Sequence, residues 1–387
     1  MRRVAVLGIG STPFGIFKDR QLEDLAADAC NRALNDAGID RKKIEAFYLS
    51  NYIYGTLNKQ EIIASMVPNI LGLKKEVEGT FLSPGIVFRN GWLLVASGLC
   101  DYVLVAGVEK MSNLTTEKIH SYISLGLEWE QERTTGLTFP GYYGMITRRY
   151  MHEFGVSLDT IHKVAVKNRK NGVKNPRAHF RREVSLDDIK NSRVIADPLK
   201  LYDCSHNADG AAAVVLGPAD MAHKFNHCVI EIMGCSQASG FSNLYAIEDL
   251  TTMLPTVYAA RKAFAMAGIR PADVDVLEIY DCFSISEIII SEDLGFFKKG
   301  EGAKALEDGL TKIGGPLPIN PSGGLLSKGH PVGTSGLGEV HEIVIQLRGE
   351  HENQVEGART GLTHYHGATS QISAVSILKR KDDLVCK

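Results

Sequence analysis

An internal repeat constrains the fold of this chain more than any other feature. Residues 33–39 (ALNDAGI) align without a gap with residues 263–269 (AFAMAGI), and in the same register Ile44 falls on Val274. In both copies a helical pattern ends at a glycine, which readily adopts the left-handed conformation that closes helices. A polar link then leads into an apolar run in both copies. Because a chance match of helix ends would not continue into the next strand, the repeat predicts a duplicated protein with a site at the seam between its halves.

Short apolar runs alternate with helical patterns along the chain. This alternation predicts an α/β fold with largely parallel, buried strands. We expect strands at 4–8, 44–49 and 101–107, and helices at 21–37, 87–98 and 338–347.

A stretch of different composition separates the two halves. We expect an N-terminal half at 1–111 plus 201–225, an inserted region at 112–200, and a C-terminal half at 226–387. The inserted region is rich in Lys, Arg, His and aromatic residues. Its cations form either a solvated helical face or a lid that binds the phosphates of a ligand.

Charge and hydropathy exclude several classes of partner. The net charge of −2 gives no reason to expect nucleic acid or an acidic membrane surface. No run approaches the roughly 18 apolar residues of a membrane span, and we see no secretory signal. The seven cysteines are scattered without zinc-ligand spacing. We therefore expect a cytoplasmic protein without a metal site.

The strongest candidate for a site is the glycine-rich segment 320–336 (NPSGGLLSKGHPVGTSG). His330 lies there between a glycine and a proline, on a rigid turn. A histidine so placed is a natural general base, since its pKa lies near neutrality, although a structural hydrogen bond would also explain it. We expect Thr334 or Ser335 to cap the helix that follows.

Two further segments place reactive side chains at strand ends. Residues 280–283 (YDCF) follow an apolar run, and carboxyl ends of parallel strands are where α/β sites form. Cys282 is either an inert buried thiol or an acid/base with a pKa lowered by a charge or a helix end, and Tyr280 could stabilise an oxyanion. Residues 363–367 (THYHG) place three polar rings before the last strand, so we expect at least one to line the site.

Together these segments resemble the thiolase superfamily, and the resemblance runs nearly end to end. Residues 101–112 (DYVLVAGVEKMS) are similar to the family strand ending in Gly-x-Glu-Lys-Met, and 209–213 (DGAAA) to its Asp-Gly-Ala-Ala strand. The turn at 329–331 resembles the catalytic-histidine loop. Residues 280–283 resemble the His-Asp-Cys-Phe motif of sterol-carrier-protein-type and archaeal thiolases, with tyrosine in place of histidine. The resemblance implies a five-layered α/β fold of two duplicated halves, normally dimeric, with an inserted lid region.

The resemblance also implies the chemistry. It implies a coenzyme A thioester as substrate, no metal or redox cofactor, and reaction at or beside the thioester carbonyl. The family nucleophile is a cysteine in a Cys-x-Ser motif at the start of a buried helix. Alignment of that helix places Phe81 at the cysteine position and Ser83 at the serine. Phenylalanine cannot attack a thioester, so we expect no acyl-enzyme at position 81.

The remaining motif positions define the candidate site. His330 and Cys282 match the family motifs, whereas Tyr365 stands at the usual second-cysteine position. The catalytic candidates are therefore His330, Cys282, Tyr280 and Tyr365, and the candidates for substrate binding are Phe81, Ser83, Asn320, Gly323, His364, Arg169 and Lys170.

Three functions stay open on this basis, and we expect the first, an acyltransferase, because most relatives carry out acyl transfer. In that reaction His330 would activate the thiol of free coenzyme A and Cys282 would protonate the carbanion. A retro-aldol lyase acting on a β-hydroxyacyl-CoA needs a base and enolate stabilisation but no nucleophile. A non-catalytic scaffold subunit would need neither a catalytic base nor enolate stabilisation.

The resemblance also suggests an assembly. It implies a homodimer core. Archaeal-type relatives, steroid aldolases and benzoylsuccinyl-CoA thiolase pair with a small subunit that carries an OB fold and a zinc ribbon, so such a partner is possible here.

Overall fold

The computed structural model describes residues 1–58, 63–73, 81–224, 228–241 and 243–381. Over these residues the main sheet has nine strands, in the order β3-β2-β4-β7-β1-β8-β11-β10-β9. The strands are β1 (Val4–Ser11), β2 (Ala46–Ser50), β3 (Phe81–Leu82), β4 (Val103–Glu109), β7 (Gly210–Pro218), β8 (Ile230–Ser239), β9 (Val276–Ile279), β10 (Thr360–Gly367) and β11 (Ile372–Arg380).

The strand order carries the duplication that the repeat predicts. From the outside inwards, the first half runs β3-β2-β4-β7-β1 and the second half runs β9-β10-β11-β8. Apart from the two-residue edge strand β3, the first strand of the chain is innermost and the second is outermost in each half. The two halves meet where β1 pairs with β8, through Ala5 with Glu231 and Val6 with Ile230.

The sheet is mixed, so the expectation of largely parallel strands is wrong. Parallel pairing is confined to β2 with β3, β2 with β4, and β9 with β10 among the described strands. The other neighbours are antiparallel. The reason is local for β10 and β11, because the short link at 368–371 can only reverse the chain, whereas a parallel return needs a long crossover.

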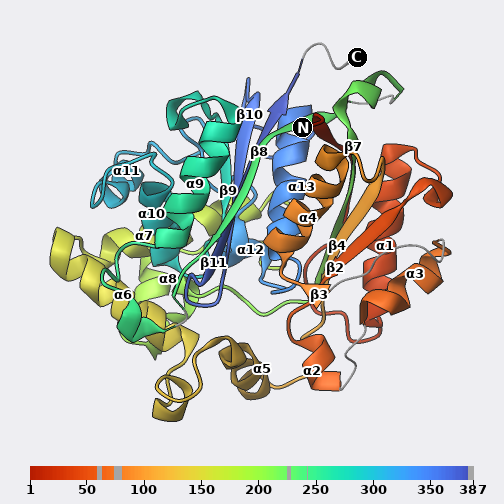
Figure 1. Cartoon of the computed structure of the whole chain (residues 1–387). Helices are drawn as coiled ribbons and strands as arrows, with labels where there is room; N and C mark the ends of the chain where they lie inside the picture. Colours follow the sequence, from red (N-terminus) through yellow and green to blue (C-terminus); the bar gives the residue numbers. More distant parts are fainter. Residues whose placement is uncertain (59–62, 74–80, 225–227, 242, 382–387) are drawn as a thin grey trace.

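Helices form three layers around the two halves of the sheet (Figure 1). Helices α4 (Pro84–Ser97) and α13 (Ser335–Arg348) lie between the halves and contact strands of both. Helices α1 (Leu22–Ala37) and α9 (Leu254–Ala267) cover the outer faces, one on each half. The result is the five-layered α/β fold that the sequence predicts.

The central helices begin earlier than the sequence pattern indicates. Helix α4 starts at Pro84, whose fixed φ suits a first helical position, and α13 starts at Ser335. The expected side-chain cap of α13 is wrong. Thr334 is its N-cap residue but donates its hydroxyl to the carbonyl of Gly210 at 3.0 Å, which ties the helix start to β7.

The inserted region packs on the second half of the molecule. It contains α5 (Thr116–Ile123), α6 (Phe139–Phe154), α7 (Leu158–Gly172), α8 (Leu186–Asn191) and the small pair β5 (Val194–Ala196) and β6 (Leu199–Lys200). Tyr143, Tyr150 and Ile161 share one apolar core with Ile279 and Ile285 of the second half. Side chains of the region can therefore reach the end of β9.

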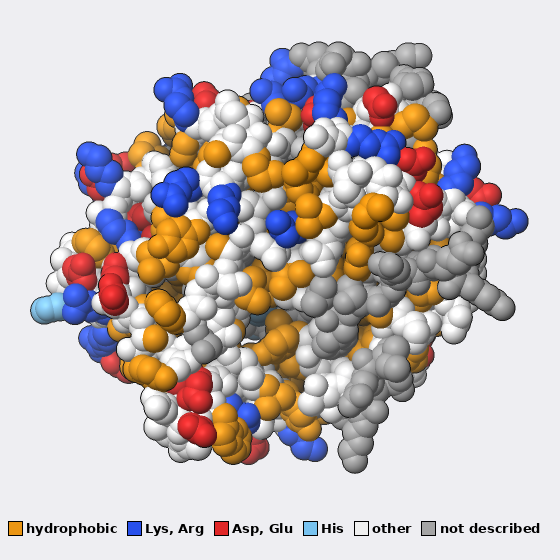
Figure 2. Space-filling model, viewed as in Figure 1, with side chains coloured by type: hydrophobic (Ala, Val, Ile, Leu, Met, Phe, Trp, Pro, Cys, Tyr) orange, Lys and Arg blue, Asp and Glu red, His pale blue; other side chains and the backbone are white. Residues whose placement is uncertain are grey.

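The remaining helices are short. They are α2 (Tyr54–Asn58), α3 (Met66–Leu71), α10 (Ser284–Asp293), α11 (Gly302–Glu307) and α12 (Gly324–Lys328). On the face shown in Figure 2, basic and acidic side chains are mixed, with apolar side chains between them. Within the described ranges, no helix has the length and hydropathy needed to cross a membrane.

Candidate active site

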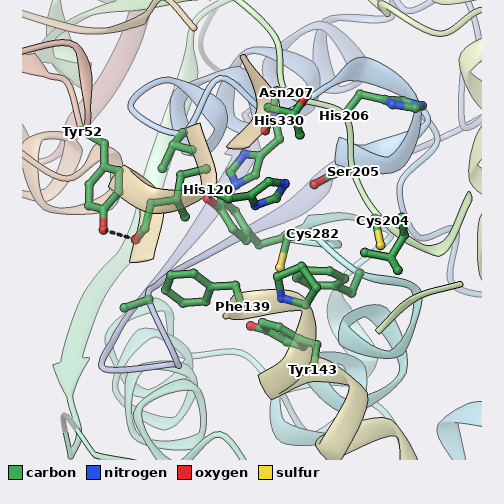
Figure 3. A pocket seen from close by; sticks show the side chains of 18 of the residues that line it. Tyr52, His120, Phe139, Tyr143, Cys204, Ser205, His206, Asn207, Cys282 and His330 are labelled. Atoms are coloured by element: carbon green, nitrogen blue, oxygen red, sulfur yellow. Dashed lines mark hydrogen bonds between the residues drawn. The ribbon is translucent and has the colours of Figure 1, made fainter. Parts of the chain in front are cut away.

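A cavity of about 420 Å³ opens at the carboxyl ends of β9 and β10 (Figure 3). Because these strands are parallel neighbours, the residues that follow them meet at one edge of the sheet. The inserted region and the loop after β2 close the other sides. The lining includes Tyr52, His120, Tyr143, His206, Tyr280, Cys282, His330, Tyr365 and His366.

His330 and Tyr280 form a hydrogen-bonded pair in this cavity. His330 Nδ1 lies 2.8 Å from the Ser335 hydroxyl, which itself donates to the Pro331 carbonyl. The Ser335 hydrogen is thus used, so Nδ1 carries the imidazole hydrogen and Nε2 is an acceptor. The Tyr280 hydroxyl lies 3.1 Å from Nε2 and donates to it. In this tautomer the Tyr280 phenol is the hydrogen-bond donor of the pair, and the basic Nε2 of His330 is its acceptor.

Burial keeps both members of this pair neutral. It lowers the pKa of His330 to about 3. It raises the pKa of Tyr280 well above its usual value, and the neighbouring Tyr365 adds to that effect. At pH 7 the imidazole is unprotonated and the phenol protonated, so a proton can pass from the phenol to the imidazole when a substrate hydroxyl replaces it.

Cys282 lies two residues before α10 and is buried. Its sulfur is 3.7 Å from the Ser286 hydroxyl and 3.7 Å from Nε2 of His366. Burial raises the pKa of this thiol to about 12. Of the two alternatives left open for Cys282, the structure favours the buried thiol over the lowered pKa, because desolvation of the thiolate outweighs the neighbouring hydrogen bonds. Cys282 is suited to give a proton and poorly suited to attack carbon.

Tyr365 inserts its ring between the starts of the two central helices. A Cβ atom on Gly85 of α4 would lie 2.8 Å from Tyr365 Cδ1, and one on Gly336 of α13 would lie 3.0 Å from Cδ2. The ring also packs edge-on against Tyr280, with centroids 5.1 Å apart. Burial raises the pKa of Tyr365 above its usual value. The two glycines are thus needed for the phenol to reach the cavity.

The segment at position 81 lies at the start of the first central helix. The backbone of Phe81 belongs to β3 and pairs with Leu49 of β2, while its side chain lies outside the described part of the structure. Ser83 is the N-cap residue of α4 with extended backbone. Among the described atoms, its buried hydroxyl has no hydrogen-bond partner of good geometry.

None of the predicted substrate-binding residues with a described side chain is part of the cavity lining. Asn320 accepts from the Ile279 amide at 2.8 Å and donates to Glu287 at 3.1 Å, which uses both ends of its side chain. Gly323 has a φ of 101°, and a Cβ atom there would lie 2.7 Å from the backbone of Gly172. His364 pairs with the Thr256 hydroxyl at 2.9 Å. Their observed contacts hold the loop and strand that carry the site.

The two predicted cations of α7 have different environments. Arg169 is fully buried, 3.2 Å from Nε2 of His206, and its guanidinium lies 4.3 Å from the centre of the Phe180 ring. Burial lowers its pKa to about 10. Arg169 thus approaches the cavity through His206, which lines it. Lys170 is exposed and lies outside the lining.

Tyr143 and His366 were missed as individual site residues. The Tyr143 hydroxyl lies 2.7 Å from His366 Nε2, and the Tyr143 ring stacks on Phe283 with centroids 4.4 Å apart. His366 belongs to the segment of polar rings that the sequence singles out. Tyr143 belongs to the inserted region, where aromatic enrichment was the available signal. Across the described residues, no three or more His, Cys, Asp or Glu side chains are arranged to hold a metal.

The chain has a duplicated α/β fold, and the cavity at its strand ends is lined by phenols, imidazoles and a thiol. These features define the class of enzyme folds to which it belongs. Within that class, residues 4–220 match the family described as "Thiolase, N-terminal domain", and residues 236–380 match "Thiolase C-terminal domain-like". The chain belongs to the thiolase family.

Several known proteins are similar over almost the full chain. An acetyl-CoA acetyltransferase of Methanothermobacter thermautotrophicus is 43% identical, covering 98% of this chain and 100% of the relative. The benzoylsuccinyl-CoA thiolase subunit BbsB of Thauera aromatica is 33% identical, covering 95% of each. Among solved structures, the Ltp2-ChsH2(DUF35) aldolase superposes with a TM-score of 0.86 at 26% identity and 99% coverage of both chains. Human mitochondrial 3-ketoacyl-CoA thiolase, at 18% identity and a TM-score of 0.76 over 98% of this chain and 99% of that one, shares the fold.

Proposed function

We propose that this chain is an enzyme that makes or breaks a carbon–carbon bond beside the carbonyl of a coenzyme A thioester, without an acyl-enzyme at position 81. The names of the similar acetyltransferase and thiolase subunit support the substrate class. The phenylalanine at position 81 offers no nucleophile, and the buried Cys282 keeps its proton. The reaction must therefore proceed by acid–base chemistry on the bound thioester.

The hydrogen bond between Tyr280 and His330 is the observation on which we choose among such reactions. The basic nitrogen of His330 faces a phenol at 3.1 Å, which suits it to receive a proton from a substrate hydroxyl through that phenol. We therefore propose a retro-aldol lyase acting on a β-hydroxyacyl-CoA. The similarity to an aldolase structure of the same fold supports this choice.

The proton balance of the cleavage follows from the site. The β-hydroxyl gives its proton to Tyr280, whose own hydrogen moves to His330 Nε2. The β-carbon becomes a carbonyl, the Cα–Cβ bond breaks, and its electron pair forms the thioester enolate. Cys282 gives its proton to Cα, and the proton on His330 returns to the thiolate through the cavity. The products are an aldehyde or ketone and a shortened acyl-CoA.

Acyl transfer is the second candidate, favoured by the 43% identity to an acetyl-CoA acetyltransferase. Here free coenzyme A gives its thiol proton to His330, and its sulfur attacks the β-keto carbonyl directly. The Cα–Cβ bond breaks, Cys282 protonates Cα, and the proton on His330 then returns to the Cys282 thiolate. This route needs Tyr280 to move aside from Nε2 so that the thiol can reach it.

We also propose that the chain works in an assembly. The similar aldolase structure carries two protein names, and the similar thiolase protein is named as a subunit. A small partner with an OB fold and a zinc ribbon, bound to a homodimer of this chain, fits both names. Co-purification from the source tests this arrangement.

The two reactions differ in their need for free coenzyme A. The enzyme, with any co-purified partner, is incubated with a β-hydroxyacyl-CoA without coenzyme A, and with a β-ketoacyl-CoA in its presence. We expect release of an aldehyde or ketone in the first mixture, detected as its hydrazone. Consumption of the thiol in the second mixture alone would select acyl transfer. If neither activity is found, and His330→Ala has no effect in either assay, the chain is a non-catalytic scaffold subunit.

A further inference from the structure

The cavity has two ends of different chemistry, with the proposed acid–base groups between them. Figure 3 shows Tyr52 and Phe139 on one side of His330 and Cys282, and His206 on the other. The basic end is lined by His179, Arg193 and His206, and the aromatic end by Tyr52, Ile123, Phe139, Pro140 and Ala368. A substrate that crosses the cavity therefore meets a guanidinium and imidazoles at one end and apolar groups at the other.

The basic end suits the coenzyme A part of the substrate. The imidazole of His179 lies 6.3 Å from that of His206, centre to centre, and His206 Nε2 lies 3.2 Å from the buried Arg169. Arg193 is exposed, and its carbonyl accepts from the Leu201 amide at 3.0 Å, five residues before His206. Phosphates bind guanidinium and other N–H donors. With the phosphates here, the acyl chain runs from the thioester sulfur toward the aromatic end.

The aromatic end is closed where three side chains converge. A Cβ atom on Gly126 would lie 2.6 Å from the Tyr52 hydroxyl, 3.4 Å from Phe139 Cζ and 3.4 Å from Ala368 Cβ. Gly126 itself lies outside the cavity lining. Its backbone therefore stands behind the three side chains that line the cavity, and a long chain bound at this end would meet a wall.

The two aromatic walls are held in place by hydrogen bonds of the protein. The Tyr52 hydroxyl donates to the Ile123 carbonyl at 3.1 Å. Thr138 caps the start of α6 by accepting from the Gly141 amide at 3.3 Å, which fixes Phe139 as the first residue of the helix. Because the Tyr52 hydroxyl uses its hydrogen within the protein, these two walls offer a ligand ring surface rather than a hydrogen-bond donor.

The backbone of Ala368 is a second indication that the shape of this end serves binding. Its φ of 54° lies in the left-handed region, which favours glycine. Strained backbone of this kind gathers at binding and active sites. The strained position carries a methyl group, and this methyl is one of the three groups that converge at Gly126.

We propose that the aromatic end binds the β-substituent of the substrate, and that this substituent is a single aromatic ring. The proposal rests on the proposed function, which defines the β-carbon. A flat ring packs well against the rings of Tyr52 and Phe139. It also loses less conformational freedom on binding than an alkyl chain of similar size. Tyr52, Phe139 and Ala368 then determine specificity, and the product of retro-aldol cleavage is an aromatic aldehyde or ketone.

Unsaturated acyl-CoA ligands separate binding at this end from the chemistry, because they lack the β-hydroxyl that cleavage requires. The enzyme with any co-purified partner is titrated calorimetrically with cinnamoyl-CoA, 2-octenoyl-CoA and crotonyl-CoA, whose β-substituents are phenyl, pentyl and methyl. We expect the Kd of cinnamoyl-CoA to be about tenfold below that of 2-octenoyl-CoA and on the order of 100-fold below that of crotonyl-CoA. The three ligands share the coenzyme A part, so the differences report on the aromatic end.

Phe139→Ala removes one wall of the aromatic end. It should raise the Kd of cinnamoyl-CoA about tenfold and leave that of crotonyl-CoA within about twofold, since a methyl group makes little contact with the ring. Leu125→Ala is the matched control, because Leu125 adjoins Gly126 but is exposed and lies outside the lining. It should leave all three Kd values unchanged. Ile123→Ala tests the same end if Phe139→Ala does not fold.

Cleavage assays separate this inference from the function on which it rests. We expect 3-hydroxy-3-phenylpropionyl-CoA to yield benzaldehyde and acetyl-CoA, with a kcat/KM at least about tenfold above that of 3-hydroxybutyryl-CoA, which yields acetaldehyde and acetyl-CoA.

Equal Kd values for cinnamoyl-CoA and crotonyl-CoA, or tightest binding of 2-octenoyl-CoA, would overturn the aromatic substituent and leave the proposed function standing. Selective binding of cinnamoyl-CoA with no cleavage of either hydroxyacyl-CoA, or of the matching β-ketoacyl-CoA with coenzyme A, would overturn the proposed function and leave the aromatic end as a binding site. Absence of binding by all three ligands would overturn both.

Discussion

The same strand–loop–helix junction occurs in both halves of the molecule and is used differently. In the register of the repeat, residues 50–53, which begin at the last residue of β2, correspond to residues 280–283 after β9. The second residue of each junction, Asn51 or Asp281, is a buried polar anchor. The third, Tyr52 or Cys282, lines the cavity. Duplication thus preserved the anchor and left the flanking positions free to diverge.

The anchors hold loops that bring the halves together at the cavity. Asn51 donates to Glu109, and the carboxylate of Glu109 also accepts from the Gly333 amide at 3.1 Å, on the turn after His330. Asp281 accepts from the Leu325 amide at the start of α12, before that turn. The first half therefore supplies support and one wall, and the second half supplies the reactive groups.

The largest expected effect comes from the first position of the junction. Tyr280→Phe removes the hydroxyl that faces His330, and we expect cleavage of a β-hydroxyacyl-CoA to fall roughly 10²–10⁴-fold in kcat. Ser50→Ala changes the equivalent residue of the first half, whose buried hydroxyl has no partner among the described groups, and should leave kcat within about twofold. Equal losses in steady-state assays of the two variants would contradict the division of labour between the halves.

A smaller effect is expected on stability, because most of the buried histidines among the described residues lie in the second half. The first 111 residues contain no histidine. The pKa of His330 is about 3 in the folded protein, against about 6.5 when unfolded. As the pH falls below 6.5 the unfolded chain binds a proton that the folded chain does not, so stability is lost.

Substitution of His330 isolates this contribution. Between pH 7 and pH 5, we expect the free energy of unfolding of the wild type to fall about 2 kcal/mol more than that of His330→Gln. Glu278, with a pKa raised to about 7 by burial, acts in the opposite direction but is common to both proteins. Urea unfolding at the two pH values measures the difference. Parallel pH profiles would show that His330 is not kept neutral.

The fold could be predicted from the sequence because periodic patterns record burial. The repeat at 33–39 and 263–269 predicts two equivalent halves, and both helices end at left-handed glycines, Gly38 and Gly268. Strand direction could not be predicted in the same way. An apolar run such as 210–218 is buried on both faces whether its neighbours are parallel or antiparallel, so its composition does not distinguish them.

The site could be predicted only where reactive groups lie in recognisable motifs. His330, Cys282, Tyr280 and Tyr365 come from three separate motifs and line one cavity. Asn320 and Arg169 have polar side chains of a kind that could bind a substrate, yet their hydrogen bonds are made within the protein. Tyr143 is 223 residues from its partner His366 in the chain, so no local pattern could link them.

The smallest expected effect tests whether the inserted region binds the phosphates of coenzyme A. Lys170 is exposed at the end of α7, and we expect Lys170→Glu to raise the KM for the acyl-CoA about threefold at low salt with kcat unchanged, and less at high salt because exposed charges are screened. Lys304→Glu, an equivalent charge reversal on α11 of the second half, should leave KM unchanged. An unchanged KM in both variants would remove Lys170 from the path of the substrate. Arg193, which lines the cavity, would then become the cation to test.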